Sequence, residues 1–130
     1  MPHGVVCLLS ALHFHDLLTK APHETWIAVD RKARRPRLNG VKVFAIQVSE
    51  TSLRTGVEQY SIEGVSVPIT DPAKSVVDAI RFREKVGIEV AVEALERLLK
   101  RKNVDRGQLL AYSRVCHVES YMQRYLEVLG

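Results

Sequence analysis

The chain has 130 residues, of which 46% are hydrophobic and only 6% aromatic, and its formal net charge is +4. This length fits one compact domain, residues 1–130, whose mostly aliphatic core needs neither disulfides nor a structural metal. The longest uninterrupted apolar run, residues 5–9, is far too short for a membrane-spanning helix, which takes about 20 residues.

The first 15 residues lack the charged start and the small-residue cleavage site of a signal peptide. We therefore expect a cytoplasmic protein in a reducing compartment. The two cysteines, Cys7 and Cys116, lie among apolar neighbours. We expect both to be free thiols that are buried in the core.

The N-terminal part of the chain combines helix- and strand-forming patterns. Apolar residues at helical spacing predict a helix over 4–18, which Ala21-Pro22 ends. Two runs of β-type residues, 25–29 and 41–47, predict strands on either side of a basic segment.

A hairpin follows, with strands over 57–62 and 65–69 joined by Glu63-Gly64. Gly64 can adopt the positive φ that a tight turn requires. Pro68 has no N–H to donate to a neighbouring strand. The second strand of the hairpin should therefore lie at an edge of the sheet or pair on one side only.

The second half of the chain is predicted to be helical. Thr70-Asp71-Pro72 is typical of a helix start, and Gly87 ends that helix. A second helix over 88–102 has six apolar residues on one face and charged pairs on the other. Asp105 begins a third helix, and apolar spacing over 118–126 predicts a fourth.

These elements together predict an α+β fold. We expect a small, mostly antiparallel sheet of about four strands after an N-terminal helix, with about four C-terminal helices packed on one face of it.

Basic residues concentrate in the segment between the first two predicted strands, at Arg31, Lys32, Arg34, Arg35 and Arg37. Pro36 and the shortage of apolar residues favour an exposed, extended loop. Such a loop can bind nucleic-acid phosphates or an acidic partner. A solvated loop without a partner is the alternative.

Patterns that could support enzyme chemistry are weak. Asp16, Asp30 and Lys32 resemble in outline the carboxylates and lysine of a metal-dependent nuclease, which is the least favoured alternative. His13 and His15 would point to different sides of a helix and so cannot easily share a metal ion. We therefore expect no catalytic residues, no metal and no cofactor.

The order and spacing of several short motifs resemble the C-terminal domain of the AbiEi family of type IV antitoxins, over nearly the whole chain. The resemblance begins with Gly4-Val5-Val6-Cys7-Leu8-Leu9-Ser10-Ala11-Leu12, Phe14-His15, Pro22-His23-Glu24-Thr25-Trp26-Ile27-Ala28, Arg34-Arg35-Pro36-Arg37 and Gly56-Val57-Glu58. It continues through Ile62-Glu63-Gly64-Val65, Pro72-Ala73-Lys74-Ser75-Val76, Asp78, Phe82-Arg83, Lys85-Val86-Gly87, Val90-Ala91, Glu93-Ala94-Leu95, Tyr112, Cys116 and Tyr125-Leu126-Glu127.

This resemblance implies an antitoxin domain from a type IV toxin–antitoxin system, of the kind that acts in abortive infection, a form of phage defence. The functional partner would be a nucleotidyltransferase-like toxin, and a stable complex with it is not required. In the family this domain follows a winged helix-turn-helix that represses transcription of its own operon. We expect that DNA-binding domain to be missing here, since the chain starts directly at the second domain.

In addition to the basic segment, the helix that starts at Thr70-Asp71-Pro72 provides a second candidate surface. Its residues are Lys74, Asp78, Arg81 and Arg83. Lys74 and Asp78 are four residues apart and can form an ion pair on the helix. The group could fix the helix to the sheet or contact a partner. No membrane or small-molecule ligand is expected.

Overall fold

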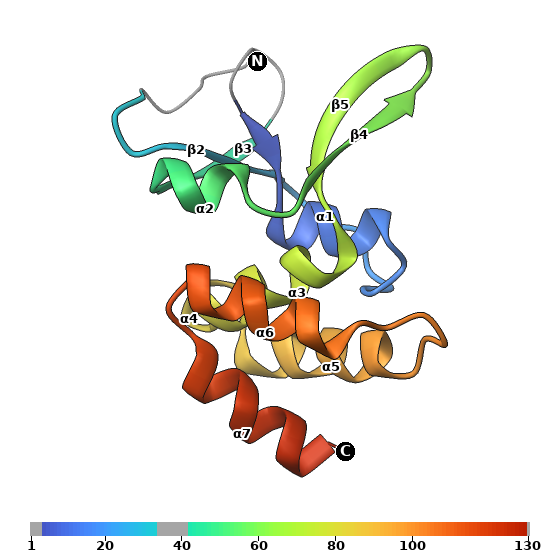
Figure 1. Ribbon diagram of the computed structural model, residues 1–130. Coiled ribbons are helices and arrows are strands. Elements are labelled where there is room, and N and C mark those ends of the chain that lie inside the picture. Colours follow the sequence, from blue (N-terminus) through green and yellow to red (C-terminus); the bar gives the residue numbers. More distant parts are fainter. Residues whose placement is uncertain (1–3, 34–41, 130) are drawn as a thin grey trace.

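The computed structural model describes residues 4–33 and 42–129, which form an α+β fold (Figure 1). The strands are β1 (Val5–Val6), β2 (Thr25–Asp30), β3 (Val43–Val48), β4 (Val57–Ile62) and β5 (Val65–Thr70). The helices are α1 (Leu8–Phe14), α2 (Glu50–Arg54), α3 (Pro72–Arg81), α4 (Arg83–Val86), α5 (Ile88–Leu99), α6 (Arg106–Val115) and α7 (Glu119–Leu129). The predicted fold class is confirmed.

The sheet differs from the prediction in its size and strand directions. Among the described residues it has five strands in the order β3-β2-β1-β5-β4. β1 is antiparallel to β2 and β5 is antiparallel to β4, but β1 runs parallel to β5 and β2 runs parallel to β3. The sheet is therefore mixed, and the expectation of a four-stranded, mostly antiparallel sheet was wrong.

The fifth strand, β1, lies within the segment predicted to be helical over 4–18. Val5 and Val6 bridge β2 to β5, and Cys7 is still extended, with φ −146° and ψ −178°. The helix itself begins only at Leu8. Val5 has the apolar character and spacing of the helix that follows, so helical periodicity concealed the strand.

The hairpin has the predicted form. Glu63 and Gly64 have φ values of 50° and 80°, and consecutive positive values are the mark of a type I′ turn. Pro68 is opposite Gln59 of the edge strand β4, whereas β1 reaches β5 only at Ile69. Pairing at Pro68 is therefore one-sided, as expected.

The helices follow the prediction except at their ends. The helix predicted between Pro72 and Gly87 is interrupted at Phe82, which has φ −102° and ψ 31° and separates α3 from the short α4. Gly87 ends α4. α5 stops at Leu99, whereas the prediction extended to residue 102. Asp71 and Asp105 cap α3 and α6 as expected. The short α2 was not predicted.

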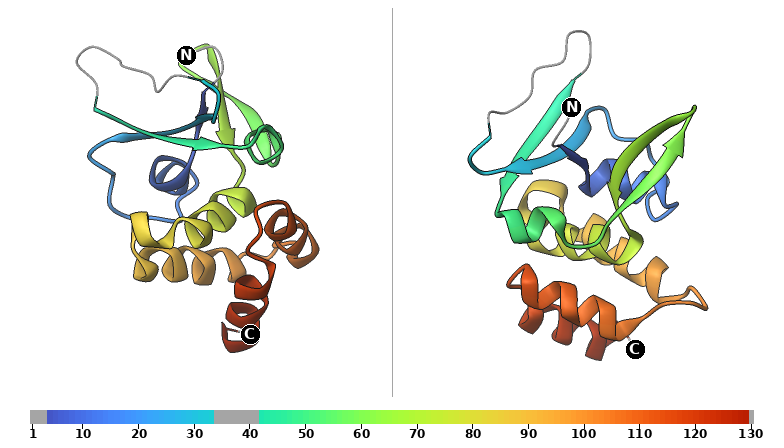
Figure 2. Two further views of the ribbon diagram at one scale, coloured as in Figure 1. Left: turned by 90° about the vertical axis from the view of Figure 1, so that its left-hand side faces the viewer. Right: turned by 45° about the horizontal axis from the view of Figure 1, so that its top comes forward.

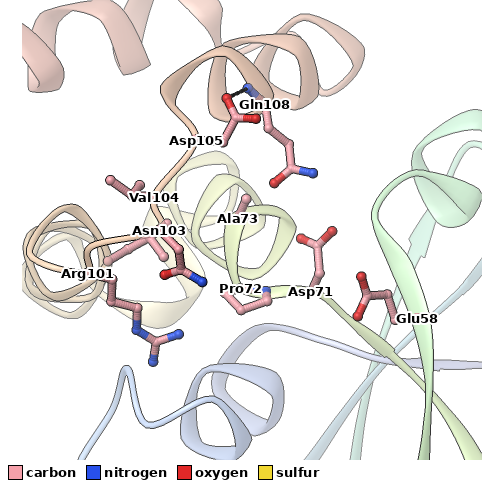
Figure 3. Close-up of a pocket in the computed structure, with 10 residues that line it drawn as sticks. Glu58, Asp71, Pro72, Ala73, Arg101, Asn103, Val104, Asp105 and Gln108 are labelled. Atoms are coloured by element: carbon pink, nitrogen blue, oxygen red, sulfur yellow. Dashed lines mark hydrogen bonds between the residues drawn. The ribbon is translucent and has the colours of Figure 1, made fainter.

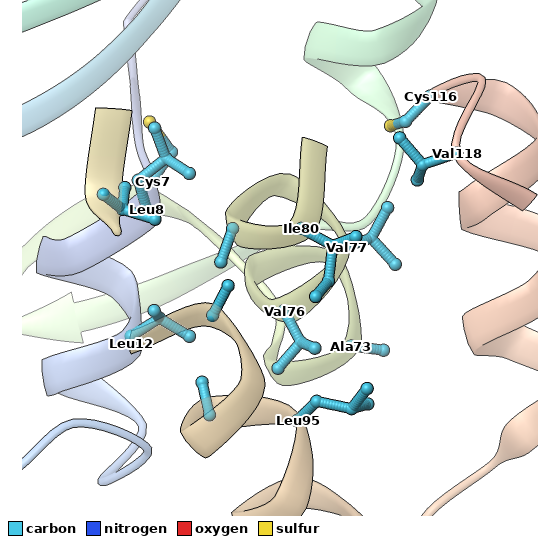
Figure 4. Close-up of a cluster of buried hydrophobic side chains, with 14 of the residues drawn as sticks. Cys7, Leu8, Leu12, Ala73, Val76, Val77, Ile80, Leu95, Cys116 and Val118 are labelled. Carbon is cyan, nitrogen blue, oxygen red and sulfur yellow. The ribbon is translucent and has the colours of Figure 1, made fainter. Parts of the chain in front are cut away.

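Helix α3 lies at the centre of the molecule, and every residue from Ala73 to Ile80 is buried. It packs against α1, α5, α6, α7 and β5. Figures 1 and 2 show α1 and the C-terminal helices α3 to α7 on one side of the sheet, whereas the short α2 lies beside β2 and β3. Figure 4 shows part of the resulting core, whose labelled members are Cys7, Leu8, Leu12, Ala73, Val76, Val77, Ile80, Leu95, Cys116 and Val118. None of the helices in the described ranges is long and apolar enough to cross a membrane.

Candidate functional site

The basic segment is described only at its start. Arg31 and Lys32 follow β2 and are exposed. The Arg31 N–H donates to the Val48 carbonyl at 2.9 Å, and the Lys32 N–H donates to Asp30 Oδ1 at 2.8 Å, so both side chains begin from an ordered turn. Arg34, Arg35 and Arg37 lie outside the described residues. The proposed role of this segment therefore stays a prediction.

The second candidate group contains a buried ion pair. Lys74 Nζ lies 3.2 Å from Asp78 Oδ2, and the two side chains are 3% and 5% exposed. Lys74 Nζ also donates to the Ser52 carbonyl at 2.9 Å. The predicted pairing is confirmed. Because both side chains are enclosed, Lys74 and Asp78 do not contribute to an accessible surface, which leaves Arg81 and Arg83.

The ion pair belongs to a polar cluster that joins three helices. Arg81 Nη1, at the end of α3, donates to Ser52 Oγ of α2 at 3.0 Å. Cys116 Sγ, at the end of α6, lies 3.8 Å from Ser52 Oγ and 3.9 Å from Asp78 Oδ1. The cluster therefore attaches α2 and α6 to α3 by polar contacts inside an otherwise apolar core.

Burial dominates the electrostatics of this cluster. It raises the pKa of the Asp78 carboxyl, and the nearby Lys74 ammonium opposes that rise. Burial also raises the pKa of both thiols, Cys7 and Cys116, and the Asp78 carboxylate adds to the increase. Both cysteines are free and buried, as predicted. Enclosed thiols that stay protonated are poor nucleophiles.

A second set of contacts surrounds the start of α3. Asp71 accepts from the Lys74 N–H at 2.7 Å through Oδ1 and from the Tyr112 hydroxyl at 2.8 Å through Oδ2. The Asp71 N–H donates to the Gly56 carbonyl at 2.7 Å. Gly56 has φ +66°, and a Cβ there would lie 2.5 Å from Lys74 Cβ. Only glycine fits this position without displacement of α3.

A cavity of about 160 Å³ opens next to this cap, between the start of α3 and the connection from α5 to α6 (Figure 3). Its polar lining residues are Glu58, Asp71, Arg101, Asn103, Asp105 and Gln108. Most of these groups already have partners within the protein. Arg101 donates to the His15 carbonyl, Asp105 Oδ1 accepts from the Gln108 N–H at 3.0 Å, and Asp71 is bound to Tyr112.

Two residues of the nuclease alternative, Asp30 and Lys32, share the end of β2, whereas the third, Asp16, comes from a different element. Asp16 lies just after α1 with φ 60°, whereas Asp30 ends β2 and Lys32 follows it. Of the histidines, His13 is exposed and His15 Nε2 lies 2.7 Å from the Thr70 carbonyl. Within residues 4–33 and 42–129, no group of three or more His, Cys, Asp or Glu side chains is arranged to hold a metal ion.

Sequence reasoning missed Ser52 entirely, although it joins Lys74, Arg81 and Cys116. A local signal exists, because Ser49 Oγ accepts from the Ser52 N–H at 3.2 Å and so caps α2. The motif could have predicted that short helix. The contacts of Ser52 with α3 and α6 have no local signal, since they join residues distant in the sequence.

Comparisons with protein-family models and with curated protein sequences give no match to this chain.

Proposed function

We propose that this chain is an antitoxin domain of a type IV toxin–antitoxin system, of the AbiEi type, and that it counteracts a nucleotidyltransferase-like toxin in the cytoplasm. The observation that carries the proposal is where the motif residues lie. Five residues come from separate positions in the motifs of the resemblance, namely Gly56, Lys74, Asp78, Tyr112 and Cys116. All five meet in the buried polar region around α3.

The convergence supports the proposal because these residues depend on one another physically. Gly56 has to lack a side chain because Lys74 fills the adjoining space. Tyr112 fixes the carboxylate that caps the helix carrying Lys74. These contacts make residues from separate motifs depend on one another, which supports the proposal that the motifs belong to one shared fold.

The buried region accounts for the fold of such a domain rather than for its action. An antitoxin must act through groups that solvent and partners can reach. The accessible candidates are Arg31 and Lys32 at the start of the basic segment, together with Arg81 and Arg83 at the end of α3 and the start of α4. The rest of the basic segment, Arg34, Arg35 and Arg37, belongs to the same hypothesis.

The test is rescue of growth. The chain and a nucleotidyltransferase-like toxin encoded next to it would be expressed from separately inducible promoters. Cells arrested by the toxin should resume growth when the chain is induced. If induction of folded chain leaves the arrest unchanged at every expression ratio, the proposal is wrong.

Two variants make the result specific. Gly56→Val should abolish rescue by disrupting the packing on Lys74. A triple replacement of Arg34, Arg35 and Arg37 by alanine should leave the fold intact and weaken rescue. Unchanged rescue by the triple variant would remove the basic segment from the proposed function while leaving the antitoxin assignment in place.

A further inference from the structure

Two cations of α4 lie over two partly exposed aromatic rings. Lys85 Nζ is 5.9 Å from the ring centroid of Phe44 in β3, and Arg83 Cζ is 4.0 Å from that of Tyr121 in α7. The two rings are 36% and 41% exposed. Residues two apart on a helix point to different sides. The four side chains therefore form a row from the sheet across α4 to α7, in the order Phe44, Lys85, Arg83 and Tyr121. We call these four residues the α4 corner.

The groups of the α4 corner are held in place by neighbouring contacts. Phe44 stacks on Trp26, with ring centroids 4.2 Å apart and an interplanar angle of 28°, and Trp26 is only 5% exposed. Arg83 Nη1 donates to the Ile80 carbonyl at 2.8 Å, which fixes the guanidinium beside Tyr121. Figure 1 shows α4 and the start of α7 on the same side of the helical layer. A ligand would thus meet a preformed surface.

Within residues 4–33 and 42–129, no salt bridge neutralises the positive charges of this corner. In the described part of the chain, ion pairs join Arg54 to Glu50, Lys74 to Asp78, Arg97 to Glu93 and Arg114 to Glu119. Neither Arg83 nor Lys85 is among them. Glu84, between the two, is exposed and is the one carboxylate of α4.

We propose that the α4 corner binds single-stranded nucleic acid. Arg83 and Lys85 would contact phosphates, while bases pack against the exposed parts of the Phe44 and Tyr121 rings. Proteins that bind single strands combine a basic track with aromatic rings in this way. A duplex keeps its bases stacked inside and offers the rings nothing to stack on. An acidic peptide would engage the cations but leave the exposed parts of the two rings without a partner.

The test uses fluorescence anisotropy with the full 130-residue chain and labelled 12-nucleotide oligo-dT and oligo-rU over a series of salt concentrations. Replacing Arg83 and Lys85 together by glutamine should weaken binding at least about ten-fold at low salt. It should also reduce the salt slope by roughly 1.4, because each single-strand phosphate contact contributes about 0.7. Tyr121→Leu should weaken binding about ten-fold, whereas Tyr121→Phe, which keeps the ring, should preserve it.

A matched control removes the same charge elsewhere. Lys100 and Lys102 are exposed near the end of α5, and their joint replacement by glutamine should leave affinity close to wild type. Glu84→Gln should tighten binding by removing a repulsive charge. Circular dichroism would establish that each variant is folded.

Three outcomes would overturn the proposal. The first is equal loss in the Lys100 and Lys102 control, which would mean that only net charge matters. The second is a Tyr121→Leu variant that binds as well as wild type. The third is displacement of the oligonucleotide by poly-glutamate as readily as by unlabelled oligonucleotide, which would assign the corner to an acidic protein partner.

Discussion

Removing the charge of Lys74 should be among the most destabilising single changes in this protein. In a Lys74→Met variant the side chain keeps a similar length and apolar character, but Asp78 loses the cation 3.2 Å away and the Ser52 carbonyl loses a donor. Removing one partner of a buried ion pair typically costs about 3–5 kcal/mol, because the remaining charge stays desolvated. Against a total stability of about 5–15 kcal/mol, this is a large fraction.

The measurement is urea denaturation, followed by circular dichroism and by the fluorescence of Trp26, the only tryptophan. The exposed pair Arg54–Glu50 has the same i,i+4 spacing, with side chains 78% and 63% exposed, and provides the control. Arg54→Met should change the free energy of unfolding by no more than about 0.5 kcal/mol. Replacing Lys74 and Asp78 together, by methionine and leucine, should recover much of the loss because no buried charge remains.

The pH dependence provides an independent check. Burial already raises the pKa of Asp78 above its usual 3.8, and loss of Lys74 should raise it further. A carboxyl whose folded-state pKa is raised binds its proton more tightly in the folded state. Its destabilising effect therefore grows as the pH rises from about 3.8 through the folded pKa, and is relieved in acid. The loss in the free energy of unfolding of Lys74→Met relative to wild type should shrink toward low pH. A loss below about 1 kcal/mol, or one that does not vary with pH, would refute this account.

Three further predictions concern other positions. Gly64→Ala should cost about 1 kcal/mol, because its φ is +80° but an added Cβ would have no atom within 4 Å. Gly56→Ala should cost clearly more in the same urea assay, because its added Cβ would clash with Lys74. Equal losses in the two variants would contradict that clash. Leu95→Ala should cost about 2–5 kcal/mol because Leu95 is fully buried, and an unchanged denaturation midpoint would count against its place in the core. Burial lowers the pKa of His15 below 6.5, so the stability that comes from its neutral ring should be lost as the pH falls below 6.5 through the folded pKa. His15→Gln should flatten the unfolding free energy over that range, and an unaltered pH profile would rule out the histidine as its source.

Local sequence patterns predicted those elements that are specified by their own residues. The hairpin depends on Gly64, and the start of α3 depends on Asp71, so both could be located from neighbouring residues. β1 could not, because its two residues are stabilised by pairing with Ile27 and Ala28 of β2 and with Ile69 of β5 rather than by anything in their own segment.

The same distinction applies to the candidate site. The spacing of Lys74 and Asp78 predicted their ion pair, since four residues make about one turn of a helix. Their burial depends on Ser52 and Cys116, which arrive from α2 and from the end of α6. The pairing of Lys85 with Phe44 and of Arg83 with Tyr121 likewise depends on how α4 lies between β3 and α7. Such contacts are set by packing, which one-dimensional periodicity does not encode.

The parallel pairing of β2 with β3 sets a length requirement on the polypeptide that joins them. Asp30 is opposite Val48, while Val43 is opposite Thr25, so the connection leaves one end of the strand pair and must return to the other. Six residues of strand extend over roughly 20 Å, and an extended chain covers at most about 3.6 Å per residue. Fewer than about six residues could not make this return. The connection, residues 31–42, has twelve residues, so deleting more than about six of them should cost the sheet its β2–β3 pairing.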